Sequence, residues 1–210
     1  MARPATKPSG GCERQSSFVT IGGGPARPPD GPHEVLLDGW GIHDRHETLN
    51  SFIWGPDGWM YGCHGVFTRS EVGRPGTPKE ERQFIDGGIW RFHPQSKEFE
   101  IFAEGLSNPW GFDLNDMGQG FATCCVIPHL FHIVQGGVYH KQSKQNVNPY
   151  VYDNIKTIRE HVHKTAHGGA RFYLADVFPE KYRDQLLKLI GDILFHYIAY
   201  LQQRLLPGHF

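Results

Sequence analysis

The chain has 210 residues, enough for one domain with a sizeable core, with or without irregular ends. Its 21 Lys and Arg residues nearly balance its 22 Asp and Glu residues, so charge does not point to a nucleic acid or an anionic membrane as partner. Gly (26), Pro (15) and 13% aromatic residues are typical of short strands joined by tight turns, which favours a mainly β fold.

Residues 1–33 are rich in Pro, Gly and Ser and predict a disordered or linker-like segment. They contain no apolar run of about 7 to 15 residues after the first positive charges, so they do not read as a signal peptide. No part of the chain stays apolar for the roughly 18 residues that a membrane-spanning helix needs. Cys12, Cys63, Cys124 and Cys125 show no CxxC or CxxCH spacing, which disfavours a zinc ribbon or a c-type haem attachment motif.

Two β-hairpins follow in chain order. Residues 52–54 and 59–61 predict two strands, because the Gly55-Pro56-Asp57-Gly58 run between them carries the proline and glycine of a tight turn. Residues 89–92 and 99–102 alternate apolar and polar side chains on both arms and predict a second hairpin.

The first hairpin has a second copy further along the chain. SFIWGPDGWMYGC (residues 51–63) aligns without a gap over GFDLNDMGQGFAT (residues 111–123), an offset of 60 residues. The matched pairs include Phe52 with Phe112, Gly58 with Gly118, and Tyr61 with Phe121. With the hairpin at 89–102 lying between the copies, the unit has about four strands, the strand count of one propeller blade. The charged, glycine-rich residues 70–82 predict an exposed loop.

Residues 34–186 are therefore predicted to form a partial β-propeller of about three blades, each a four-stranded antiparallel sheet. Residues 187–210 have a different spacing of apolar residues, because Leu and Ile recur there at steps of three and four residues. This spacing predicts an amphipathic helix that caps the β array or mediates self-association.

Histidines supply the candidate chemistry, and the chain has 13 of them. His46 precedes a predicted strand, so it stands on a loop at a strand end, where repeat β folds display catalytic groups; the alternative is a polar surface turn. Asn108 holds the equivalent place in the second copy and could orient a ligand or cap a turn. His161, His163 and His167 could ligate a metal, or serve as hydrogen-bonded structural side chains.

Three segments together resemble the six-bladed propeller of the soluble quinoprotein glucose and aldose-sugar dehydrogenases. They are similar above all to planctomycete-type relatives that are named membrane-bound dehydrogenases and are often fused to haem-binding domains. The segments read HETLNSFIWGPDGWMYGCHG, GLSNPWGFDLNDMGQGFATCCVIPHLFHI and HGGARFYLADVFPEKYRDQL. The resemblance covers residues 34–186 and implies oxidation of a sugar or other alcohol, with hydride passing to pyrroloquinoline quinone (PQQ).

The resemblance also implies roles for individual residues. His46 would be the general base that takes the proton from the substrate hydroxyl, a role that suits an imidazole. Asn108 matches the asparagine of a cofactor-holding R-N-P-x-G motif, and His167 would lie near the cofactor. The backbone carbonyls of Ile127 and Pro128 would bind calcium, since a carbonyl ligand needs no particular side chain.

Three features depart from the family pattern. Ser107 stands where the motif has arginine, and serine cannot supply the bidentate grip that arginine gives to a quinone carboxylate. The later blades are missing after residue 186, so the sequence predicts a partial copy about half a propeller long, whose open sheet edges would favour self-association. The family is exported, whereas this chain shows no signal peptide.

These departures support a second hypothesis, a non-catalytic module derived from a propeller that binds carbohydrate or protein. Trp54, Trp59, Trp110 and His64 would then line the binding surface.

Overall fold

The computed structural model describes residues 16–20, 34–44, 47–125, 129–142, 150–158, 167–190 and 193–199. These residues form a mainly β fold with short 3-10 helices at Lys79–Glu81 and Glu180–Tyr182. The first strands are β1 (Ser16–Thr20), β2 (Glu34–Trp40), β3 (Asn50–Trp54), β4 (Met60–His64), β5 (Ser70–Val72), β6 (Gln83–Ile85), β7 (Gly88–Phe92) and β8 (Phe99–Glu104). The later strands are β9 (Pro109–Leu114), β10 (Gly120–Cys124), β11 (Leu130–Ile133), β12 (Gly137–Val138), β13 (His167–Tyr173), β14 (Gln185–Ile190) and β15 (Ile193–Ala199).

The largest sheet contains a four-stranded antiparallel meander. Its strand order is β12-β8-β7-β4-β3, in which β3, β4, β7 and β8 follow one another in sequence and β12 joins the far edge of β8 in parallel. Both predicted hairpins belong to this meander, so they are confirmed. The remaining described sheets are β1-β2, β5-β6, β11-β10-β9 and β13-β14-β15.

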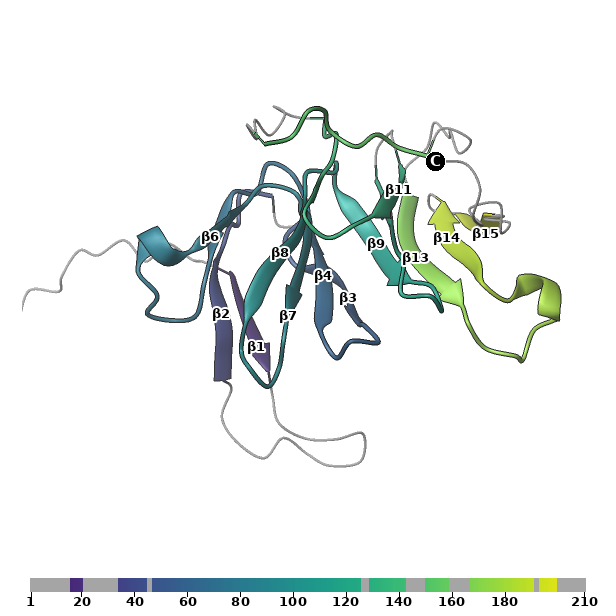
Figure 1. The fold of residues 1–210 in the computed structure, drawn as a ribbon, viewed down its shortest axis with the longest axis horizontal. Helices are drawn as coiled ribbons and strands as arrows, with labels where there is room; N and C mark the ends of the chain where they lie inside the picture. Colours follow the sequence, from purple (N-terminus) through teal and green to yellow (C-terminus); the bar gives the residue numbers. More distant parts are fainter. Residues whose placement is uncertain are drawn as a thin grey trace, which may run out of the picture.

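The sheets are packed face to face in the order of the sequence (Figure 1). β10 shows this most clearly, because all five of its residues are buried. Ala122 and Cys124 pack with residues of the five-stranded sheet, whereas Phe121 packs with Phe172 of β13 and Leu186 of β14. Alternate side chains of a strand point to opposite faces, so the β9–β11 sheet is covered on both sides.

A further cluster joins β2 to the other face of the five-stranded sheet. Leu37 and Trp40 of β2 pack there with Trp90 and Phe92 of β7. The centroids of the Trp40 and Trp90 rings lie 5.3 Å apart. The five-stranded sheet and the β9–β11 sheet thus each use one face for the sheet before them and the other for the sheet after them.

The repeat predicted from the sequence is also a repeat of hydrogen bonds. Gly55 N–H donates to Trp59 O (2.8 Å), and 60 residues later Asn115 N–H donates to Gln119 O (3.0 Å). The hydrogen bonds within the two turns match as well, from Gly58 N–H to Gly55 O and from Gly118 N–H to Asn115 O. The pairing of Ile53 with Tyr61 recurs as that of Asp113 with Phe121.

The predicted C-terminal helix is wrong over the residues described there, because β14 and β15 occupy that part of the chain. β14 pairs antiparallel with β13, and Leu186 is fully buried against Phe172. The edge of β13 offers backbone hydrogen bonds that compete with helix formation, and Leu and Ile pack well in either structure. Residues 200–210 lie outside the described part of the chain.

Two segments predicted to be irregular contain strands. β1 falls within the linker-like N-terminal segment and pairs with β2. β5 falls within the predicted loop 70–82 and pairs with β6. Short strands of this kind escape prediction, because three to five residues carry too little periodicity to separate them from a loop.

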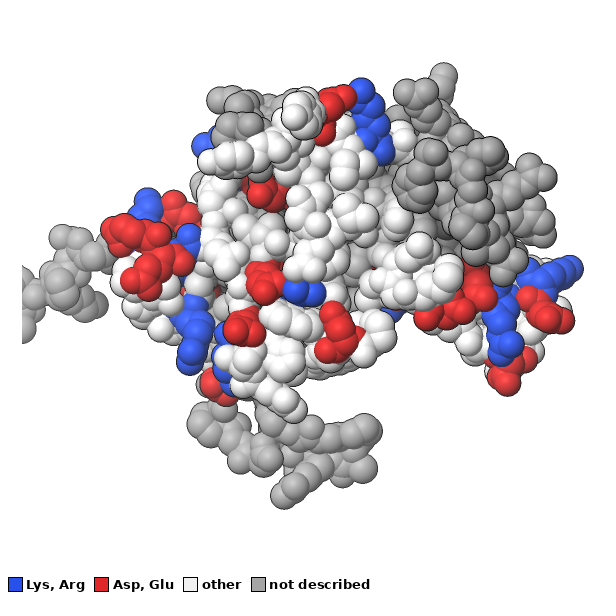
Figure 2. Space-filling model, in the orientation of Figure 1, with Lys and Arg blue, Asp and Glu red and all other residues white. Residues whose placement is uncertain are grey.

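Charged side chains of both signs are intermixed over the surface (Figure 2). On the face shown, they gather at the left around β6 and at the right over the chain between β13 and β14. Among the described residues, no helix has the length and apolarity needed to cross a membrane.

Candidate functional site

Three strands from three successive sheets lie side by side and point the same way. Backbone atoms of Gly111 in β9 and Ala170 in β13 lie so close that a Cβ added to Gly111 would be 2.3 Å from Ala170 N. Further along, Phe172 N–H donates to Asp113 Oδ2 (2.7 Å). Residues of β3 join these two strands around a pocket of about 200 Å³, lined by Ser51, Ile53, Gly111, Phe112, Gly169, Ala170 and Arg171.

The candidate site lies where these strands begin, and Asn108 is its centre. Asn108 Nδ2 donates to Glu47 Oε1, and Asn108 Oδ1 accepts a hydrogen bond from Val66 N–H (3.0 Å). The Asn108 backbone has φ of 54°, a left-handed conformation that asparagine tolerates better than most residues. The side chain is therefore fixed at both ends, and it links the segment before β3 to the loop after β4.

Asn108 also holds the chain that follows β10, because its carbonyl accepts a hydrogen bond from Cys125 N–H (2.9 Å). Burial raises the pKa of the Cys125 thiol, and the negative charge of the nearby Glu47 carboxylate raises it further. Glu47 is buried, with 8% of its surface exposed. A carboxylate, an amide and a thiol from three different segments thus meet at this end of the strands.

The structure brings together the neighbours of the residues that the sequence singled out. His46, Ile127 and Pro128 lie outside the described residues, but Glu47 follows His46 directly. Similarly, Cys125 lies two positions before Ile127. The three segments predicted to carry the base, the cofactor-holding asparagine and the calcium carbonyls therefore converge at Asn108.

His167 is the first residue of β13. Because β13 runs alongside β9 in the same direction, His167 lies at the end of β13 that is nearest to Asn108. His161 and His163, the other members of the proposed histidine cluster, lie outside the described residues. Within the described ranges, no group of three or more His, Cys, Asp or Glu side chains could hold a metal ion.

A buried ion pair supports the loop that contacts Asn108. Phe67 N–H donates to Asp86 Oδ1 (3.2 Å), and Lys141 Nζ lies 3.2 Å from Asp86 Oδ2. The Lys141 side chain is only 2% exposed. The next residue, Gln142, donates its N–H to the Ser107 hydroxyl (2.6 Å). Ser107, which stands where the family motif has arginine, therefore anchors the chain beside the ion pair.

His64 has a structural role. It is fully buried, with Nδ1 2.8 Å from Gly65 O and Nε2 2.8 Å from the Ser70 hydroxyl. A carbonyl can only accept, so we place the proton on Nδ1, and the unprotonated Nε2 faces the Ser70 hydroxyl. Burial lowers the pKa of His64 to about 4. The imidazole is therefore neutral at pH 7 and does not line a surface, contrary to the binding-module hypothesis.

Sequence reasoning missed Glu47, Lys141 and Asp86. Glu47 stands next to His46 in a polar run that reads as a surface turn, and the sequence gives no sign of its burial. Lys141 and Asp86 are separated by 55 positions, and only the fold brings them together. A gap-free repeat locates turns and strands, but it does not reveal which polar side chains will be buried.

Residues 31–193 match the model of a protein family described as a domain of unknown function (DUF7133). Because the match spans more than half of the chain, the chain belongs to this family. No curated protein matches the chain.

Proposed function

We propose that the chain is part of a β-propeller of the quinoprotein sugar dehydrogenase type, and that the end of the strands at Asn108 binds a sugar or other alcohol. Two features of the fold support the propeller. The β3-β4-β7-β8 meander has the strand order of a blade, and the hairpin hydrogen bonds recur at an offset of 60 residues. Propeller blades also pack face to face around a central channel, as these sheets do around the pocket between β3, β9 and β13.

The observation that carries the proposal is the convergence at Asn108. Three segments that the family resemblance assigns to catalysis and binding could have lain anywhere on the surface. Instead, Asn108 donates a hydrogen bond to Glu47 and accepts one from Cys125 N–H, and these two residues adjoin two of the segments in sequence. A carboxylate and a carboxamide at the start of the strands that line this pocket suit the hydroxyl groups of a sugar, which both donate and accept hydrogen bonds.

The resemblance implies PQQ as the electron acceptor, with calcium, and the described residues fit the two unequally. The groups that contact the Asn108 side chain are a carboxylate and a backbone N–H, so a quinone carboxylate would meet negative charge there. Lys141, the buried cation nearby, already faces Asp86. Around the Asn108 side chain, the described residues therefore offer no cation to a quinone carboxylate. The Glu47 carboxylate is an oxygen ligand of the kind that Ca²⁺ prefers.

Reconstitution of the purified chain tests the proposal. With PQQ and calcium, aldoses should reduce an electron-accepting dye. His46→Ala should abolish turnover while cofactor binding is retained, because the base role needs the imidazole. His93→Ala, which removes a histidine from the β7–β8 turn, is the matched control and should keep turnover. Full turnover in His46→Ala would remove this residue from the base role.

A non-catalytic carbohydrate-binding module is the second candidate, and the missing cation beside Asn108 favours it. Trp54 is 65% exposed and borders a pocket of about 330 Å³ at the other end of β3. If this candidate is right, the chain fails to bind the quinone but still binds sugar, and Trp54→Ala weakens that binding. Failure to bind either quinone or sugar would contradict both candidates.

A further inference from the structure

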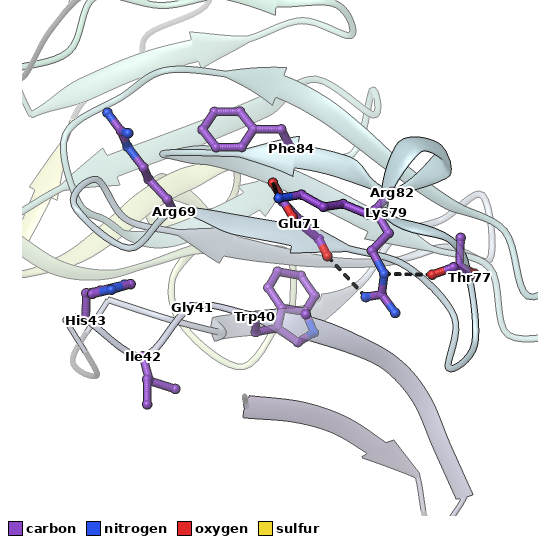
Figure 3. A pocket seen from close by; sticks show the side chains of 11 residues that line it. Trp40, Gly41, Ile42, His43, Arg69, Glu71, Thr77, Lys79, Arg82 and Phe84 are labelled. Carbon is purple, nitrogen blue, oxygen red and sulfur yellow. Dashed lines mark hydrogen bonds and ion pairs between the residues drawn. The ribbon is translucent and has the colours of Figure 1, made fainter. Parts of the chain in front are cut away.

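A larger cavity lies between β2 and the β5–β6 hairpin (Figure 3). Its volume is about 790 Å³, within the range of small-molecule sites. One wall is the end of β2 and the residues that follow it, and the other is the β5–β6 hairpin with the 3-10 helix between these strands. It shares no lining residue with the pocket between β3, β9 and β13.

Three cationic side chains line this cavity, and two of them form ion pairs with carboxylates. Arg82 Nη1 lies 2.6 Å from Asp38 Oδ1, and Lys79 Nζ lies 3.4 Å from Glu71 Oε1. Arg69 is exposed at the cavity wall and makes no hydrogen bond or ion pair with a described residue. Of these three cations, only Arg69 has no carboxylate partner among the described residues, so its guanidinium donors are available.

Two aromatic side chains, Trp40 and Phe84, also line the cavity. Trp40 is fully buried at the base of the cavity, and its indole Nε1–H has no hydrogen-bond partner among the described residues. Phe84 is 55% exposed on the opposite wall. A buried hydrogen-bond donor without a partner costs free energy of folding. The exposed phenyl ring on the opposite wall offers an apolar contact surface.

From this combination we infer that the cavity binds an acidic sugar, with Arg69 holding its carboxylate and Phe84 contacting its ring. A guanidinium presents two parallel N–H donors that match the two oxygens of a carboxylate. A sugar ring fits a site that combines an aromatic surface with several polar groups. This inference does not depend on the proposed function at Asn108.

The charge balance selects a singly charged ligand. Arg69 can neutralise one carboxylate, whereas a phosphate dianion would place a second negative charge near the Glu71 carboxylate, which lines the cavity. The Arg82 side chain is held in place by the hydrogen bonds that it donates to Thr77 O (3.0 Å) and Glu71 O (3.2 Å). The surroundings of the anion are therefore already ordered before a ligand arrives.

Isothermal titration calorimetry on the full chain tests the inference with four probes: glucuronate, glucose, acetate and inorganic phosphate. Glucuronate should bind most tightly, because only it combines the carboxylate with the ring. Arg69→Gln should weaken glucuronate binding by about tenfold or more, the effect expected for a charge-assisted bidentate contact. Arg74→Gln is the matched control, since Arg74 is exposed nearby and does not line the cavity.

Three results would overturn the inference. In Asn108→Ala, where the proposed sugar site is weakened, glucose binding as tightly as glucuronate would show that the carboxylate is not recognised. Acetate or phosphate binding as tightly as glucuronate would show that the ring is not recognised. Unchanged glucuronate affinity in Arg69→Gln would place the ligand elsewhere. Asn108→Ala should leave glucuronate binding intact, so failure of the proposed function and failure of this inference are distinguishable.

Discussion

His64 shows how burial sets the chemistry of a single side chain. Folded His64 has a pKa of about 4, whereas in the unfolded chain it titrates near the usual value of about 6.5. Between these values the unfolded state binds a proton that the folded state does not. We therefore expect the free energy of unfolding to fall as the pH is lowered from about 6.5 to about 4, by up to about 3 kcal/mol.

Urea denaturation at several pH values measures this slope. His64→Gln should flatten it, because glutamine does not titrate, even if the variant is less stable at neutral pH. His43→Gln removes an exposed histidine instead and should keep the wild-type slope. An unchanged slope in His64→Gln would mean that another group causes the pH dependence.

The ion pair of Lys141 and Asp86 supports a second prediction at this scale. Lys141→Ala leaves the Asp86 carboxylate without its buried cation, so we expect a loss of about 3 to 5 kcal/mol in the free energy of unfolding. Lys156→Ala breaks a pair with Asp153 in which both side chains are more than half exposed, and it should cost less than about 1 kcal/mol. Equal losses would show that the Lys141 pair is solvated.

The sequence predicted the place of Asn108 but not its environment. Its position at a strand end followed from the repeat, and the structure confirms that position. Its bond to Glu47 spans 61 positions and depends on how two sheets pack, which local pattern does not encode. Site residues on turns are thus easier to find from sequence than the buried groups that hold them.

At the scale of elements, the two hairpin turns should respond alike to the same substitution. Gly58 and Gly118 have φ of 83° and 76°, and a Cβ added to either would meet no atom within 4 Å. Alanine at either position should lower the free energy of unfolding only by the cost of the left-handed backbone conformation, about 1 to 2 kcal/mol. Thermal or chemical denaturation of Gly58→Ala and Gly118→Ala should therefore give losses that agree within about 0.5 kcal/mol.

Gly111→Ala provides the contrast, because its Cβ would lie 2.3 Å from the backbone nitrogen of Ala170. Strands β9 and β13 would have to separate, so we expect a larger loss than at either turn. If Gly111→Ala loses no more free energy of unfolding than Gly118→Ala, β9 and β13 are not closely packed at this position.

The helix predicted after residue 186 illustrates the limit of periodicity. Leu186 and its neighbours fit a helical spacing, but Gly191 and Asp192 stand between two apolar runs, and this pair is common in two-residue hairpins. This hairpin signal favours the strands β14 and β15 over a helix. The open edge of β13, which decides between the alternatives, is a property of the fold and not of the segment.

At the scale of the molecule, face-to-face packing should make the sheets unfold together. Leu186 in β14 is fully buried against Phe172 and Phe121, which belong to two different sheets. Leu186→Ala should lower the free energy of unfolding by about 2 to 5 kcal/mol, with a single transition. Leu174→Ala, at a position 46% exposed, is the control and should cost less than about 1 kcal/mol.

Circular dichroism and tryptophan fluorescence should follow the same transition in both variants. A separate early transition in Leu186→Ala would show that β13–β15 unfold independently of the rest.

The two-residue strand β12 has a consequence for biosynthesis. It completes the five-stranded sheet by pairing with Ala103 and Glu104, yet it is translated only after all of β9–β11. On the ribosome, the first large sheet therefore remains one strand short until the next sheet has emerged. The five-stranded sheet is thus tied to its neighbour by the order of synthesis, because it reaches its final set of strands only after β9–β11 have emerged.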